Sequence, residues 1–285
     1  MSAWLRLFMP RRIGWLTGAG TVGCCLVLAA AVLGPSLAPH PVQLVHMLEN
    51  VDPPKQPPSL THPFGTDWHG LDVFSKVLWG ARYSLTVGLA STAVSMLIGL
   101  FVGLTSGYFG GFYDGLWMRL VDVVLAFPSL LLAILIAASL EPGLLTIFLA
   151  LSMVSWAQIA RLIRSLVLSL REQEFVVAAV ALGASHCRVI LAHILPNLLP
   201  TLVVIFSTRI GVMILSEASL NFLGLGAPSE APSWGVMVFF GMDHFNEAAW
   251  CSVFPATAIA LTVFSFNLVG DGVRDALDPR LKDAA

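Results

Sequence analysis

Two charged side chains, Arg209 and Glu217, stand inside apolar stretches of this 285-residue sequence. A charge in an apolar surrounding is unfavourable, so such a residue commonly faces a water-filled path, a partner or an opposite charge. At about 100° per residue the two side chains lie roughly 80° apart on a helix, so a direct pair between them is not assured. We therefore predict that they line a polar path or a subunit interface, with a structural ion pair as the alternative.

A second pair of opposite charges, Arg119 and Asp122, is separated by three positions. Residues three apart on a helix lie on the same face. This spacing predicts a structural ion pair between them.

Motifs for covalent or nucleotide chemistry are missing from the sequence. None of its lysines, Lys55, Lys76 and Lys282, follows a glycine, so there is no GxxxxGK[ST] phosphate-binding loop. The zinc-protease pattern HExxH and the nucleophile pattern GxSxG are missing as well. We predict that the chain catalyses no reaction and binds neither ATP nor another cofactor.

Histidines and cysteines lack the spacing of a metal site. Neither CxxC nor closely spaced histidine ligands occur, so we expect no bound metal, although passage of a metal past the histidines stays conceivable. The cysteines are expected to pack as small apolar side chains without a chemical role. The cysteines are Cys24, Cys25, Cys187 and Cys251. The histidines predicted on the external side of the membrane are His40, His46, His62, His69 and His244.

A different kind of signal lies in residues 176–197, which read "VVAAVALGASHCRVILAHILPN". Residues 175–182 can form a helix that Gly183 ends, and Ser185 is a plausible N-cap for a second helix. Pro196 is predicted to end or kink that second helix. Because its residues are small, few side chains project from this segment, and such a surface suits docking onto another protein. An ordinary alanine-rich loop is the alternative. The predicted docking residues are Ala178, Ala179, Gly183, Ala184, Ser185, Leu195 and Pro196.

The elements that carry these residues belong in a membrane. The sequence is 57% hydrophobic and 11% charged, against about 25% charged residues in a soluble domain. Its main solvent is therefore lipid. The net charge of −2 gives no electrostatic case for a nucleic-acid partner.

Six stretches approach the length of about 20 apolar residues that a membrane helix needs. Arg11 and Arg12 precede the first, which is longer than a cleaved signal sequence allows, so we expect a retained anchor. The predicted spans are residues 13–38, 83–107, 117–140, 143–163, 198–221 and 250–270.

The distribution of lysine and arginine places both termini in the cytoplasm. The predicted order is a cytoplasmic segment, an anchor, an external loop with an amphipathic approach, a five-helix core and a cytoplasmic tail. The core contains a cytoplasmic loop and a second external segment. In residue numbers these are 1–12, 13–38, 39–82, 83–271 and 272–285, with the cytoplasmic loop at 164–197 and the external segment at 222–249.

Small residues recur every fourth position in the second span. This spacing places them on one helix face, where they allow another helix to approach closely. We predict a packing seam, either within the bundle or with a second subunit, and chance in a glycine-rich sequence is the alternative. The residues are Ser91, Ser95, Gly99, Gly103 and Gly107.

The 176–197 stretch resembles the EAA loop of ABC-importer permeases, whose pattern is E-A-A-x3-G-x9-I-x-L-P. Gly183 aligns with the glycine and Leu195-Pro196 with the closing pair, while Val177 and His193 depart from the glutamate and the isoleucine. The resemblance implies that this loop forms a coupling helix that docks into a cleft of an ATPase subunit. The missing glutamate leaves no specific salt bridge there but keeps the shape of the surface.

Nearly the whole chain resembles the C-type subunit of the dipeptide/oligopeptide/nickel permeases. The elements are "GTDWHGLD", "SLNFLGLGAPSEAPSWGVM" and "DPRLK", with Leu71 in a position where the family commonly has arginine. The resemblance implies an all-α, six-span permease of type I ABC-importer architecture in a bacterial inner membrane.

The resemblance also implies partners. They are a paralogous B-type permease, two ATPases that bind ATP and magnesium, a periplasmic or lipid-anchored binding protein, and membrane lipid. Peptides, glutathione and nickel or metallophore complexes stay open as solutes. A stand-alone secondary transporter and a membrane scaffold are the competing classes, and the first lacks the intramembrane carboxylates that it needs.

Overall fold

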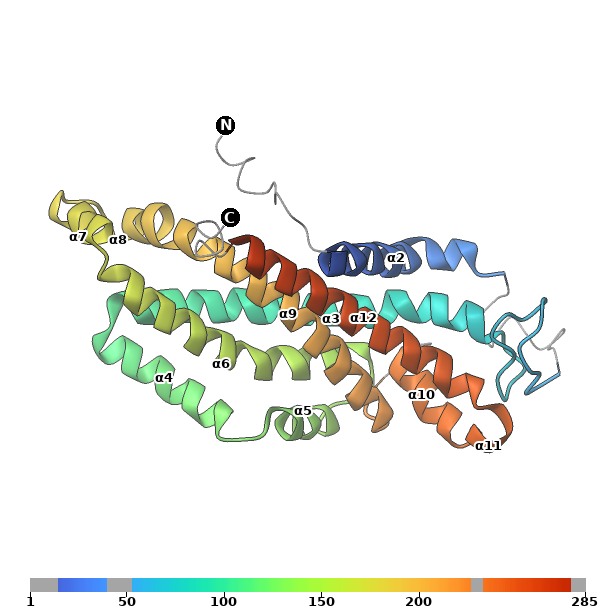
Figure 1. Cartoon of the computed structure of the whole chain (residues 1–285). Coiled ribbons are helices and arrows are strands. Elements are labelled where there is room, and N and C mark those ends of the chain that lie inside the picture. The colour runs from blue at the N-terminus through green and yellow to red at the C-terminus, as the bar shows by residue number, and fades with distance from the viewer. Residues whose placement is uncertain (1–14, 40–52, 227–232, 278–285) are drawn as a thin grey trace.

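The computed structural model describes residues 15–39, 53–226 and 233–277. In this described part the elements are all helical and no strand occurs (Figure 1). The predicted segment 1–12 and the "DPRLK" element at 278–282 lie outside the described residues. The elements are α2 (Trp15–Leu37), α3 (Val73–Phe109), α4 (Gly111–Leu125), α5 (Ser129–Ala138), α6 (Leu144–Arg171), α7 (Glu174–Ala181), α8 (His186–Arg188), the π-turn η2 (Val189–Ile194), α9 (Leu195–Phe222), α10 (Trp234–Met242), α11 (Phe245–Ala248) and α12 (Trp250–Leu277).

Five helices of the described part are long and apolar enough to cross a membrane. A sixth span exists only if α4 and α5 are counted together, and these two are bent by 84°. The all-α membrane fold is therefore confirmed, and the predicted span at 117–140 corresponds to the bent pair of α4 and α5 rather than to one helix. The break precedes Pro128, and a residue before proline is pushed out of the helical conformation.

The longest helix, α3, starts at Val73 rather than at the predicted residue 83. The side chain of Asp72 caps it by accepting a hydrogen bond of 2.8 Å from the backbone N–H of Ser75. The stretch predicted as a separate amphipathic approach is thus the first part of the span itself. The helix ends at Gly110, whose φ of 66° is unfavourable for other residues.

Close packing of α3 on α6 occupies the centre of the molecule. A Cβ added at Gly99 would lie 2.7 Å from Ile159, and one at Gly103 would lie 2.7 Å from the carbonyl oxygen of Ala160. Gly107 meets Val167 in the same way at 2.8 Å. Ser91 and Ser95 on the same face are fully buried. The predicted seam is confirmed, and it lies within the chain.

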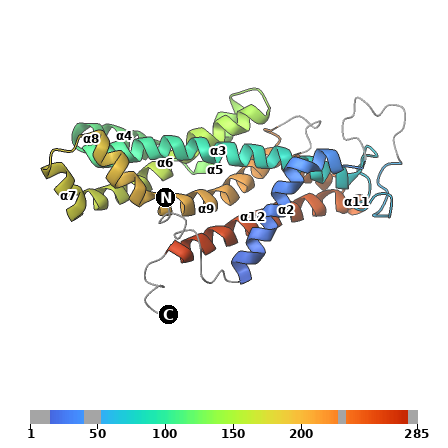
Figure 2. The same cartoon turned by 90° about the horizontal axis from the view of Figure 1, so that it is seen from above.

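The remaining helices are arranged around α3, which runs most of the length of the molecule (Figures 1 and 2). α2 packs on α3 and α12, while α9 packs on α12 and α3. The helices α7 and α8 lie at one end of the molecule, and α11 with the loop 53–72 lies at the other. The predicted docking residues and the predicted external segments are therefore at opposite ends.

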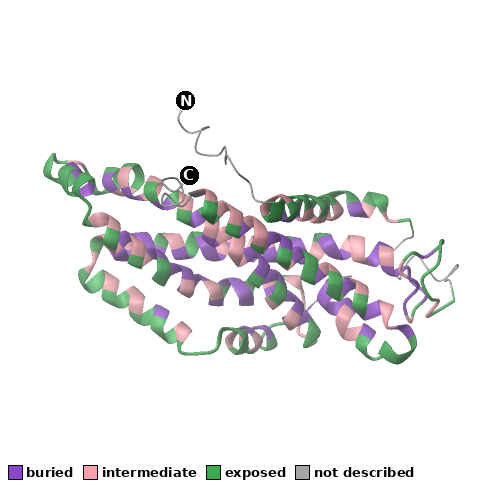
Figure 3. Cartoon of the chain, viewed as in Figure 1, coloured by how far each residue is buried: buried purple, intermediate pink, exposed green. Residues whose placement is uncertain are grey.

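Many residues along α4 and α5 are exposed (Figure 3), and the large ones are mostly apolar. Phe112 is 89% exposed and Leu135 is 65% exposed. Such a surface is stable in lipid and would aggregate in water.

The loop 53–72 is irregular, as predicted, and is folded against the ends of α3 and α12. A buried ion pair joins the Lys76 Nζ to Asp67 at 2.8 Å, and the Trp250 Nε1 donates to the carbonyl of Thr66 at 3.0 Å. At the surface, a hydrogen bond from Lys55 holds the pKa of Glu247 below its usual range. These contacts fasten the loop to the bundle.

Two ion pairs connect α4 to α6. Arg164 donates two hydrogen bonds to the carboxylate of Asp114. This carboxylate also accepts a hydrogen bond of 2.6 Å from the Ser106 hydroxyl. Asp122 pairs with Arg161. The predicted Arg119–Asp122 pair is therefore wrong, because the face of α4 that carries Asp122 turns toward α6.

The α3–α6 seam predicts a steric effect that depends on position. Gly103→Val places two methyl groups where Ala160 and Ile163 already lie, so it should lower the free energy of unfolding by about 1–3 kcal/mol. Gly115→Val is the matched control, because nothing lies within 4 Å of a Cβ there. Melting temperatures of the two purified variants in detergent measure the difference. Equal melting temperatures would contradict the seam.

The two α4 carboxylates allow a comparison within one helix. Asp114→Asn leaves Arg164, which is 29% exposed, without its partner, and should destabilise the fold by about 1–3 kcal/mol. Asp122→Asn breaks a pair whose side chains are 50% and 66% exposed, and should change stability by only about 0–1 kcal/mol. Thermal unfolding of both variants tests this order, and the reverse order would refute it.

Candidate functional site

The segment between α6 and α9 forms a helical hairpin at one end of the molecule (Figure 1). Its first helix, α7, covers nearly the predicted residues. Gly183 follows with a φ of +81°, which confirms the predicted break. The Ser185 hydroxyl accepts a hydrogen bond of 3.4 Å from the backbone N–H of Arg188, so the predicted N-cap is confirmed too.

Of the two predicted effects of Pro196, to end or to kink the second helix, the first does not occur. The chain from His186 to Phe222 is one continuous helical span, and Pro196 lies in the first turn of α9. A proline inside a helix clashes with the carbonyl four residues earlier and donates no hydrogen bond. The preceding π-turn, Val189–Ile194, widens the helix just before this position and accommodates the ring.

The predicted docking residues divide between two faces of the hairpin. Ala178, Gly183 and Ser185 are exposed. Ala179 is buried at 9% exposure and Ala184 is half-buried against the core, so these two support the hairpin from within. Leu195 and Pro196 are also half-buried and belong to the start of α9.

Larger apolar residues of the exposed face were missed by the sequence analysis. Leu182 is 88% exposed, Val177 is 55% exposed and Val180 is 49% exposed. The signal was the helical spacing, because Val176 and Ala179 share the buried face of α7 and leave Val177 and Val180 exposed. An exposed apolar surface at an end of the molecule is a candidate site for binding another protein.

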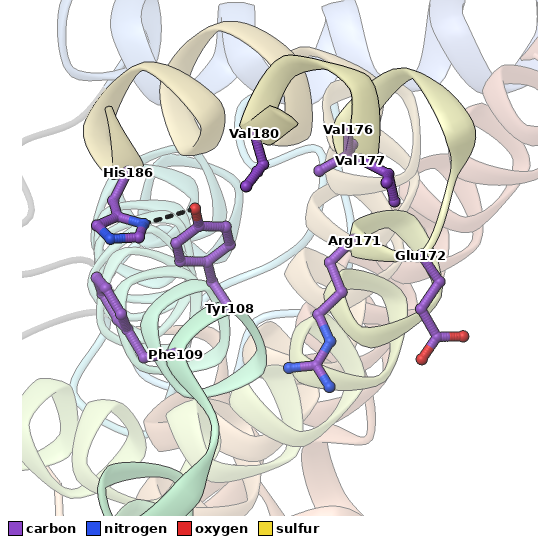
Figure 4. Close-up of a pocket in the computed structure, with 8 residues that line it drawn as sticks. All are labelled: Tyr108, Phe109, Arg171, Glu172, Val176, Val177, Val180 and His186. Carbon is purple, nitrogen blue, oxygen red and sulfur yellow. Dashed lines mark hydrogen bonds between the residues drawn. The ribbon is translucent and has the colours of Figure 1, made fainter. Parts of the chain in front are cut away.

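A pocket of about 430 Å³ lies beneath α7, between the ends of α3 and α6 (Figure 4). The Tyr108 hydroxyl and the His186 Nδ1 are 2.9 Å apart and share a hydrogen bond. Arg171 donates to the carbonyl of Gly107 at 3.0 Å. The lining residues are Tyr108, Phe109, Arg171, Glu172, Val176, Val177, Val180 and His186.

These contacts connect the hairpin to the end of α3. His186 is packed edge-on against both Tyr108 and Phe109, with ring centroids 5.7 and 5.9 Å apart. Val176 and Val189 are buried in the same cluster as Ile163 of α6. The hairpin is therefore packed on α3, α6 and α9.

The two charges predicted inside the spans have different surroundings. Arg209 is half-buried and its Nη1 donates to the Gln158 Oε1 at 2.6 Å. Glu217 is fully enclosed by its own chain and accepts a hydrogen bond from Asn221. They do not pair with each other, and Glu217 reaches neither a path nor a free surface in this structure.

Within the described residues, no three His, Cys, Asp or Glu side chains are grouped so that they could hold a metal ion. His40 and His46 lie outside these residues. Cys24 and Cys251 are buried, while Cys25 and Cys187 are exposed.

Comparison with known proteins gives consistent matches along the chain. The profile of the family described as "Binding-protein-dependent transport system inner membrane component" matches residues 77–283. The oligopeptide transport system permease protein OppC of Bacillus subtilis (strain 168) is 38% identical over 282 residues, 99% of this chain and 91% of that protein. The glutathione transport system permease protein GsiD of Escherichia coli O1:K1 / APEC is 42% identical over 257 residues, 90% of this chain and 84% of that protein. The protein of the same name from Shigella boydii serotype 4 (strain Sb227) has the same identity and coverage.

Proposed function

This chain belongs to the family of inner-membrane components of binding-protein-dependent transport systems, and from that premise we propose that the hairpin 174–197 is its docking site for an ATPase. The chain is a multi-pass permease of the bacterial inner membrane, of the dipeptide/oligopeptide class of ABC importers. In the proposal it forms half of the translocation pathway, and a paralogous permease forms the other half. It hydrolyses no ATP itself.

The exposed apolar face of the hairpin carries this proposal. Leu182 projects at the turn after α7, and Val177 and Val180 border the open pocket beneath this helix. The helix is held on the bundle by buried residues such as Val176. A short helix held in this way fills a groove in a partner, as helix-in-groove recognition requires. No charge of the hairpin is needed for docking, which agrees with Val177 standing where related loops have glutamate.

The proposed orientation places the hairpin and both termini in the cytoplasm. It follows from the excess of arginine in the segments on that side. The loop 53–72 and α11 then face outward, at the opposite end of the molecule, where a periplasmic or lipid-anchored binding protein delivers the solute.

The mechanism that we propose is alternating access driven by the partners. Two ATPases bind ATP and magnesium, close on each other and carry the hairpin with them. Because α7 follows directly from α6, and the π-turn leads directly into α9, both spans must move with it. Such rigid-body movement between two states opens the pathway to one side at a time.

For the solute we propose a peptide. Relatives named for oligopeptide and glutathione transport support this class, since both solutes are peptides. The chain is proposed to bind no metal or cofactor of its own.

Co-expression tests the whole proposal. The chain, its neighbouring permease, two ATPases and the binding protein are purified together and placed in liposomes with ATP inside or outside. A stable complex with ATP-dependent uptake of a peptide, stimulated by the loaded binding protein, is expected. Purification of the chain alone, with no ATPase attached, would contradict it.

The conformation of Gly183 provides a sharper prediction. Nothing lies within 4 Å of a Cβ built at this position, so only its φ of +81° restricts which residue can replace the glycine. Gly183→Val should strain the turn by about 1–3 kcal/mol and weaken ATPase docking about 5- to 150-fold. Gly183→Asn is the control, because asparagine tolerates this conformation.

ATPase activity that depends on the loaded binding protein measures the effect for both variants. It should fall strongly for valine and stay near wild type for asparagine. Equal activity of the two variants would show that the backbone of this turn has no part in docking.

A further inference from the structure

A polar stripe runs along the outer faces of α6 and α9, on either side of Arg209. Residues at spacings of three and four share a helix face. On α6 and α9 this spacing connects residues that are mostly polar and are exposed or half-buried in the chain. They are Ser155, Gln158, Leu162, Ser165 and Ser169 on α6, and Arg209, Val212, Ser216 and Ser219 on α9.

This stripe is unlike the surfaces that face lipid. The outer face of α5 exposes Leu130, Leu131 and Leu135 and no charged group. A guanidinium at the centre of a span is unfavourable in hydrocarbon by about 3 kcal/mol. The α6–α9 face therefore lines water or a partner, and its hydroxyls continue toward both ends of the spans. Ser169 lies near the hairpin, and Ser219 lies near the opposite end of α9.

The guanidinium of Arg209 keeps most of its hydrogen-bonding capacity. It has five N–H donors, and one of them is used by the Gln158 Oε1 at 2.6 Å. Among the described residues no carboxylate lies within ion-pair distance of it. Glu217 is enclosed and bonded to Asn221, and the carboxylates of α4 pair with arginines of α6.

The surrounding hydroxyls do not neutralise this charge. Ser216 donates to the carbonyl of Val212 at 2.9 Å, and Ser219 donates to that of Leu215 at 2.8 Å. Their protons are used within the helix, so only weakly polar oxygens face outward. The stripe thus presents one fixed positive charge midway along a mildly polar surface.

We propose that Arg209, oriented by Gln158, binds the carboxylate of the peptide as it crosses the membrane. This inference rests on the proposed function as a peptide importer. A forked guanidinium suits a carboxylate because two parallel hydrogen bonds can form. The alternative is that Arg209 forms a fixed ion pair with a carboxylate of the second permease. Such a pair needs polar residues only at the point of contact. The polar stripe instead extends to both sides of Arg209, as a path for a solute requires.

The test compares a peptide with its C-terminal amide. The complete complex with its binding protein is reconstituted in liposomes, and ATP-dependent uptake of each solute is measured for wild type and Arg209→Gln. The ratio of variant to wild type is taken for each solute separately, so that unequal loading of the binding protein cancels. Arg209→Gln should lower peptide uptake about tenfold or more, since the bonds to a charged group are lost, and should leave amide uptake almost unchanged.

Two further variants serve as controls. Arg82→Gln makes the same change in charge at an exposed position of α3 and should alter neither uptake. Arg209→Lys keeps the charge without the fork and should retain part of the preference for the free carboxylate. Assembly of each variant is checked by recovery of the second permease and both ATPases.

The outcomes separate this inference from the function on which it rests. Equal loss of both uptakes in Arg209→Gln would overturn the carboxylate site and indicate a pair with the second permease. Unchanged uptake of both would overturn it as well. If the wild-type complex assembles but imports neither solute, peptide import itself is wrong, and the carboxylate site falls with it.

Discussion

The close approach of α3 and α6 is the contact on which the other features depend. Gly99, Gly103 and Gly107 let branched side chains and carbonyl oxygens of α6 pack directly on the backbone of α3. In lipid there is little hydrophobic force between helices, so such close van der Waals packing has to hold the bundle. This pair positions the pocket beneath α7 at one end and the polar face of α6 along its side.

Around this centre, the hairpin lies at one end of the molecule and the face of α6 and α9 that carries Arg209 lies along its side. The hairpin is packed on the ends of α3 and α6 through Tyr108, His186 and Val176, and it leads into α9 without a break. Gln158 lies farther along α6, and Arg209 lies farther along α9. In the proposed mechanism, movement of the hairpin displaces the face that carries these two residues.

Local physics explains which parts of this arrangement the sequence could predict. The turn at Gly183 and the cap at Ser185 depend on neighbouring residues alone, and both were found. The partner of Asp122 was not, because it depends on which face of α4 meets α6. The continuation of the helix past Pro196 could not be predicted, because a π-turn without a clear sequence signature accommodates its ring. The 84° bend before Pro128 was overlooked because composition shows an apolar stretch but not its direction.

Photo-crosslinking in the assembled complex tests most directly whether the hairpin is the docking site. A crosslinking amino acid is placed at Leu182, which is 88% exposed at the hairpin, or at Leu60, which is fully exposed at the opposite end of the molecule. Docking of the hairpin on an ATPase predicts a crosslink to that subunit from Leu182 and none from Leu60. A crosslink to the ATPase from Leu60, or none from Leu182 in an active complex, would contradict both the docking site and the proposed orientation.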